Sequence, residues 1–285
     1  MSHAPRTRII LGVWTALIMA FLLIPIGLIV LYAFNPSNVQ SWPIKGFSTK
    51  WFSEAFHNQA MKDSFWLSIK AACLSTAIAI TLGSMVAFAV HRFRFFGRET
   101  VSFVLILPLA LPGIITGMAL NSFFTFADVE FSLMTIVIGH ATFCIVTVYN
   151  NVLARLRRTQ SSLIEASMDL GADGWQTFRH VTLPVVATAL VAGGLLAFAL
   201  SFDEVIVTTF TAGAQNTLPL WIFGNIRLGK NLPEVNVVVL FVIILTLIPV
   251  FLAQRLTRDT GVLKAPGGST KDSAQTEATL GAGAH

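Results

Sequence analysis

Two carboxylates lie next to each other in one of the apolar stretches of the sequence. Asp203 and Glu204 fall within residues 201–210, and ionisable residues in such apolar surroundings are candidate functional residues. Neighbouring positions on a helix point about 100° apart, so we expect one of the two, Asp203, to face a path. The pair also lies about 27 Å along a helix from Val185, close to one end of a membrane span, which leaves an interfacial pair as the alternative.

Other patterns in the sequence come close to a phosphate-binding, metal-binding or redox site but do not predict one. Residues 224–230 come close to a phosphate-binding loop, but Asn231 stands where such a loop needs a metal-binding serine or threonine. Cys73 and Cys144 fall inside apolar segments without the spacing of a metal or redox site, and the six histidines are scattered. We therefore expect no enzyme, no catalytic or metal-binding residue and no cofactor, so that energy must come from a partner chain.

A polar loop at residues 153–184 carries the other candidate residues. They are Glu165, Ala166, Ser167, Asp169, Gly171, Leu183 and Pro184. Ser162 and Glu165 have the spacing of a capping box, which predicts a short helix that ends near Leu170. Gly171 can adopt the left-handed conformation with which such a helix stops.

The second half of this loop predicts another short helix, from Gly174 to His180. Pro184 suits the first turn of the membrane span that follows, where a missing amide costs nothing. The loop is then a stiff helix–turn–helix element outside the membrane that can transmit force to a span, with Glu165 and Asp169 on one face. The alternative is an amphipathic helix lying on lipid, but an acidic face is poorly suited to anionic headgroups.

The composition places these residues in a membrane protein. Of the 285 residues 54% are hydrophobic and 12% are charged, whereas a soluble domain carries about a quarter charged residues. Six apolar runs are long enough to cross a bilayer as helices, and no alternating strands are apparent. An all-α protein with six transmembrane helices is predicted, with spans near residues 9–32, 65–90, 101–126, 133–152, 185–210 and 235–253.

The basic residues orient these spans. With the N-terminus inside, 13 of the 19 lysines and arginines fall in cytoplasmic segments and five in external ones, as the positive-inside rule requires. Both termini and the loop at 153–184 are then cytoplasmic. We divide the chain into a first helix with an external segment (1–62), a five-helix core (63–255) and a disordered cytoplasmic tail (256–285).

Two spans contain residues that disturb a simple helix. Pro108, Pro112 and Gly113 should break or bend the third span, and the break either lines a cavity or is a packing kink. His140 in the fourth span is expected to make hydrogen bonds between helices rather than to bind a ligand.

The loop at 153–184 also resembles a known element. Glu165-Ala166-Ser167, Gly171 and Val181-Thr182-Leu183-Pro184 resemble the EAA loop of ABC importer permeases, with Ser167 for the second alanine and Val181 for the usual isoleucine. The resemblance implies a type I importer permease (MetI-like) fold in which this loop is the socket for a cytoplasmic ATPase. It also implies a bacterial inner-membrane complex with a second permease, two ATPase copies and an extracytoplasmic substrate-binding protein.

Most of the chain, about residues 5–258, resembles the permease subunits of spermidine/putrescine-type importers. The similarity includes residues 200–210, 217–220 and 233–236. It implies a polyamine substrate, for which an acid such as Asp203 is chemically suitable. Gly113 departs from the best-known polyamine permeases, which often carry an acid after the proline of the third span, so another cationic or amino compound is the alternative substrate.

Two functions of other classes remain as alternatives. An ion-coupled secondary transporter acting alone would show inverted-repeat symmetry and ionisable residues at the membrane midplane, and neither is apparent in the sequence. A non-transporting docking or sensor subunit would use the loop at 153–184 only to bind a partner. Nucleic acid is not an expected partner, because topology accounts for the basic residues.

Overall fold

Helices form all the regular secondary structure of residues 5–260, which are the residues that the computed structural model describes; side chains are described for Thr7 and for residues 9–247. A chain that crosses lipid needs helices because they satisfy every backbone polar group internally. The helices are α1 (Pro5–Ala33), α2 (Lys50–His57), α3 (Gln59–Arg92), α4 (Arg98–Ala110), α5 (Gly113–Phe126), α6 (Leu133–Arg158), α7 (Ser161–Asp169), α8 (Gly174–Thr177), the π-helical turn η1 (Phe178–Thr182), α9 (Leu183–Phe202), α10 (Ile206–Thr211), α11 (Leu218–Leu228) and α12 (Leu232–Thr260).

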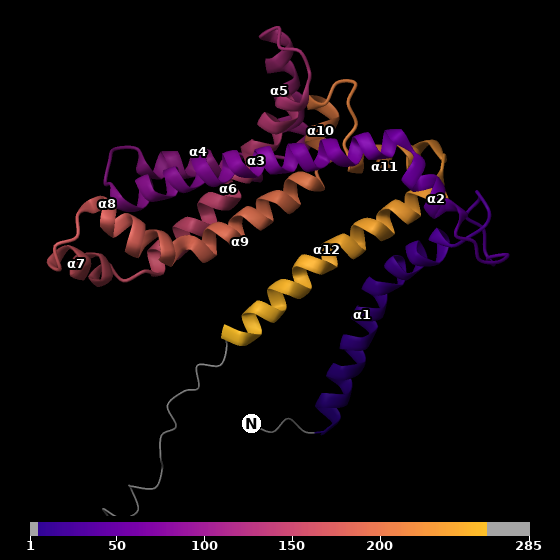
Figure 1. Ribbon diagram of the computed structural model, residues 1–285, viewed down its shortest axis with the longest axis horizontal. Helices are drawn as coiled ribbons and strands as arrows, with labels where there is room; N and C mark the ends of the chain where they lie inside the picture. Colours follow the sequence, from indigo (N-terminus) through magenta and orange to yellow (C-terminus); the bar gives the residue numbers. More distant parts are fainter. Residues whose placement is uncertain (1–4, 261–285) are drawn as a thin grey trace, which may run out of the picture. The chain divides into compact units, whose positions relative to one another are not determined.

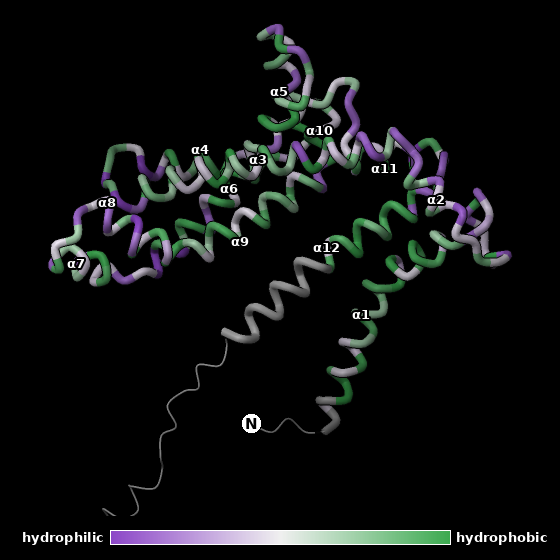
Figure 2. The backbone as a smooth tube through the Cα atoms, in the orientation of Figure 1, coloured by the Kyte–Doolittle hydropathy of each residue, from purple (hydrophilic) through white to green (hydrophobic). Residues whose placement is uncertain are grey.

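Within residues 5–260, four single helices are long and apolar enough to cross a membrane. They are Ile9–Ala33, Gln59–Arg92, Leu133–Arg158 and the continuous stretch Gly174–Phe202. Hydrophobic residues dominate α1 and α9, whereas hydrophilic residues are frequent around α8 (Figure 2).

The third predicted span is broken, as the prolines indicate. Helix α4 ends at Ala110 and α5 begins at Gly113, and the two are bent by 104° relative to one another. Pro112 is the N-cap residue of α5, a position where its missing amide costs nothing. The sequence prediction of a break is therefore confirmed.

Helix α12 begins the last apolar segment. The chain divides into two compact units, Met1–Val237 and Val238–His285, so that most of α12 belongs to the second unit. Its apolar part with described side chains is Leu232–Leu247, and the helix continues to Thr260. The rest of the predicted tail, residues 261–285, lies outside the described residues. The count of six spans and the orientation of the termini stay predictions.

Helices α3, α6 and α9 form the centre of the first unit and lie side by side (Figure 1). Glycines allow them to approach closely. A Cβ atom on Gly83 of α3 would lie 2.8 Å from the carbonyl oxygen of Ile145, and one on Gly193 of α9 would lie 3.3 Å from the Cα of Val148. Helix α6 is thus enclosed, and 14 of its 26 residues are buried.

Candidate coupling element and substrate path

Helix α7 opens the polar loop that follows α6. Its N-cap residue is Gln160, and no side chain caps the helix. The predicted capping box of Ser162 and Glu165 is therefore wrong, because the helix begins at Ser161 and encloses Ser162 in its first turn. A capping box with the same spacing lies further along: Asp173 Oδ1 accepts the amide of Gln176 at 2.7 Å, and Gln176 Oε1 accepts the amide of Asp173 at 3.0 Å.

The end of α7 follows the prediction. Gly171 has a φ of +86°, in the left-handed region. Its amide donates to Met168 O at 2.9 Å, and the amide of Ala172 donates to Ser167 O at 3.1 Å. This pair of bonds is the Schellman arrangement, which satisfies the last carbonyls of a helix and turns the chain sharply.

The second helix of the element does not stop at His180 as predicted. It runs from Gly174 through the π-helical turn at 178–182 into α9, as one stretch of 29 residues ending at Phe202. Pro184 explains the wide turn, because its ring would clash with the carbonyl of residue 180 in a regular α-helix. The amide of Leu183 accordingly donates to Phe178 O, five residues back. Leu183 and Pro184 form the first turn of α9, but α9 is not a separate helix.

Three contacts hold this region together, one within the element, one between the element and α3, and one between α6 and α9. Ser167 Oγ and Thr177 Oγ1 are 3.1 Å apart and join α7 to α8. The Phe178 ring meets the Phe88 ring of α3 edge to face, with centroids 5.4 Å apart. Arg155 Nε, near the end of α6, donates to the carbonyl of Val185 at 2.9 Å.

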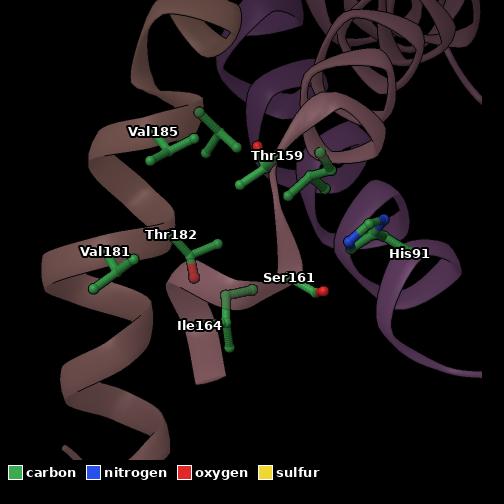
Figure 3. A pocket seen from close by; sticks show the side chains of 9 residues that line it. His91, Thr159, Ser161, Ile164, Val181, Thr182 and Val185 are labelled. Carbon is green, nitrogen blue, oxygen red and sulfur yellow. The ribbon is translucent and has the colours of Figure 1, made fainter. Parts of the chain in front are cut away.

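A small cavity of about 110 Å³ lies where α7 meets the ends of α3, α6 and α9 (Figure 3). Helix α7 contributes Ser161 and Ile164 to its wall, and α3 contributes His91. Most of the lining is apolar. The wall of this cavity thus combines residues of α7 with the ends of three long helices.

The outer surface of this element is acidic and apolar. Glu165, Ala166, Asp169 and Gly171 are all exposed, and none of the nine residues of α7 is buried. Leu170 and Trp175 have exposed fractions of 89% and 67%. The acids were predicted from the sequence, whereas the exposure of these two apolar side chains was not.

The two predicted path residues lie at a second break, which the sequence analysis missed. Helix α9 ends at Phe202 and α10 begins at Ile206, so the predicted span at 185–210 is interrupted. Glu204 Oε1 accepts the amide of Val207 at 2.9 Å and so caps α10, whereas Asp203 is exposed. The two carboxylates therefore differ: Glu204 is engaged, and Asp203 is available.

The breaks of the third and fifth spans meet. A Cβ atom on Gly113, the first residue of α5, would lie 3.7 Å from Ile206 Cγ2 at the start of α10. One turn further, a Cβ atom on Gly117 would lie 2.6 Å from the Phe210 ring. Asn121 Nδ2 also donates to Phe210 O at 2.7 Å. Two interrupted helices packed together are typical of a transporter site, where irregular backbone lines a cavity.

Comparison with known proteins identifies related membrane transport proteins. Residues 79–259 match the family model described as "Binding-protein-dependent transport system inner membrane component". The chain is 32% identical over 266 residues to the spermidine/putrescine transport system permease protein PotC of Shigella flexneri, with 93% of this chain and 99% of that protein covered. It is 36% identical over 250 residues to the putrescine transport system permease protein PotI of Escherichia coli (strain K12), with 83% and 86% covered.

The fold is also similar to a solved structure. The match is to a chain in the crystal structure of a bacterial ABC transporter involved in the import of the acidic polysaccharide alginate. The TM-score is 0.66 at 17% identity, and the match covers 90% of this chain and 99% of that chain. At this level of identity the likeness concerns the fold alone.

Proposed function

The chain belongs to the family of binding-protein-dependent transport system inner membrane components, and from this premise we propose that it imports putrescine, spermidine or a related cationic amine. The family confirms the all-α permease fold and the membrane location expected from the sequence. The chain is a permease subunit of an ABC importer rather than an enzyme, and the secondary-transporter alternative is not favoured.

The observation that carries the substrate class is the pair of acids at the junction of two broken helices. Asp203 is exposed and, among the described residues, accepts no side-chain hydrogen bond, whereas Glu204 is occupied in capping α10. A free carboxylate beside irregular backbone suits an ammonium group, because it replaces hydration that the cation loses on entry. The names of the relatives point to the same class of substrate.

The coupling role rests on the element at 161–182. Its exposed surface presents Glu165, Ala166, Asp169 and Gly171, and we assign to this surface the binding of a cytoplasmic ABC ATPase. Ser167 ties α7 to α8 through Thr177, while Leu183 and Pro184 belong to the continuous helix that carries movement toward residue 203. A full importer would hold a second permease, two ATPase copies and an extracytoplasmic binding protein.

The test is ATP-driven uptake of labelled putrescine and spermidine by proteoliposomes that contain the assembled importer. We expect Asp203→Asn to reduce uptake more than the matched change Glu204→Gln, because the glutamine keeps an oxygen to cap α10. We expect Glu165→Ala to lower uptake and substrate-stimulated ATPase activity together. Equal, mild effects of the Asp203 and Glu204 variants would favour an interfacial pair, and uptake of neither amine by the unmodified importer would overturn the substrate class.

A further inference from the structure

We propose that His140 is the positioning residue of the broken fifth span, and that it works as a neutral ring with its proton on Nε2. The imidazole joins the two halves of the span across the break at 203–205 and so sets where Asp203 lies. The expected effect of His140 on transport rests on the proposed role of Asp203, whereas the protonation of its ring can be tested independently of that role.

The geometry places His140 between the two helix halves. Its Nδ1 lies 2.7 Å from Ser201 Oγ, in the last turn of α9, and its Nε2 lies 2.8 Å from Thr208 Oγ1 in α10. His140 and Thr208 have exposed fractions of 1% and 0%, and Ser201 of 3%. Water therefore does not substitute for these bonds, and a buried polar group left without a partner is costly.

The hydrogen bonds determine which ring nitrogen carries the proton. Thr208 Oγ1 also lies 2.7 Å from the carbonyl oxygen of Glu204, which can only accept, so the single hydroxyl proton of Thr208 is given there. Thr208 must then accept from His140, which requires a proton on Nε2. In the neutral ring Nδ1 is an acceptor, and Ser201 donates to it. Ser201 thus donates to the His140 ring, the ring donates to Thr208, and Thr208 donates to the backbone carbonyl at the break.

Helix α6 provides a platform for both halves. Thr135 Oγ1 donates to Thr211 O of α10 at 2.7 Å. Cys144 Sγ contacts Ala197 O of α9 at 3.3 Å. His140 differs from both because it binds the two helix halves. Gly139 lets α10 approach, since a Cβ atom there would lie 3.1 Å from Val207 Cγ1. The ring therefore acts next to a place where α10 lies close to α6.

The transport test compares His140→Leu, His140→Gln and, as a control on the same face of α6, Cys144→Ala. We expect His140→Leu to raise the KM for uptake about tenfold with a smaller change in maximal rate, as the loss of two intramembrane hydrogen bonds predicts. A glutamine offers one donor and one acceptor, so His140→Gln should recover part of the loss. In an Asp203→Asn background the effect of His140→Leu should shrink, because both changes act through one carboxylate. Additive effects, or no rescue by glutamine, would contradict the positioning role.

A second measurement does not depend on any substrate. Nitrogen NMR of the unmodified protein, labelled with ¹⁵N-histidine in lipid bilayers, distinguishes protonated from bare ring nitrogens, and the signals absent in His140→Gln identify this residue. We expect a protonated Nε2 and a bare, hydrogen-bonded Nδ1. A proton on Nδ1 or on both nitrogens would overturn the inference even if polyamines are transported. The expected ring with no polyamine uptake would leave the inference standing and refute the substrate.

Discussion

Replacement of Gly171 tests whether the coupling element depends on its backbone turn. Gly171 has a φ of +86°, and a Cβ atom there would meet nothing within 4 Å, so the cost of a side chain is purely conformational. That cost is about 1–2 kcal/mol for alanine in the left-handed region and less for asparagine. Proline costs about 3 kcal/mol or more, because it fixes φ near −65° and removes the amide that binds Met168 O.

Little in the chain offsets these costs. Helix α7 has nine residues, none of them buried, and isolated helices of this length are marginal in water. The whole cost therefore lowers the population of the formed element, at about tenfold for each 1.4 kcal/mol. Gly174, three residues on, is a matched control: it also meets nothing within 4 Å but is helical with negative φ.

The assay is substrate-stimulated ATPase activity and ATP-driven uptake in the reconstituted importer, normalised to inserted protein. We expect activity to fall in the order wild type and Gly174→Ala, Gly171→Asn, Gly171→Ala, Gly171→Pro, with about tenfold lost in the alanine variant. Near-normal coupling in Gly171→Pro, or equal losses in Gly171→Ala and Gly174→Ala, would refute the reasoning.

Three further substitutions test the packing and the break. Gly83→Ala brings a Cβ atom to 2.8 Å from the backbone of α6, so we expect a loss of about 1–3 kcal/mol, seen as a lower melting temperature in detergent; an unchanged melt would contradict this close approach. Gly117→Ala collides with Phe210 at 2.6 Å and should lower uptake, and Phe210→Ala in the same chain should restore part of it; a double variant no better than the single one argues against the contact. Glu204→Ala removes the cap on Val207 and should cost about 1 kcal/mol, whereas Glu204→Gln keeps it; equal uptake by both would show that the cap is unimportant.

The sequence predicted the features that local chemistry decides. The break after Ala110 follows from two prolines and a glycine, which act on their own backbone. The left-handed turn at Gly171 follows from a residue without a Cβ atom. Both features need no distant partner, so a motif is sufficient to find them.

The features that were not predicted depend on contacts between distant residues or on the residue at which a helix begins. The break at 203–205 is supported by His140, which lies more than sixty residues away in the sequence. The helix from α8 to α9 also continues through a π-helical turn at 178–182, where the sequence alone predicted a stop at His180. Asp173 and Gln176 have the spacing of a capping box, as Ser162 and Glu165 do, but Ser162 cannot cap α7 because this helix begins at Ser161.

The continuous stretch Gly174–Phe202 joins α8, η1 and α9 into one helix that would act as a single lever under the proposed function. Its 29 residues correspond to a length of about 43 Å. A tilt of about 10° about one end would carry the other end through about 7 Å, which exceeds the rise of a full helical turn. An ATPase that pushes on residues near Trp175 would then shift Asp203 without any helix unwinding. The wide turn at 178–182 lets the helix continue past Pro184, because the amide of Leu183 binds Phe178 O five residues back. The displacement of Asp203 would then depend on the length of the helix rather than on a change in its conformation.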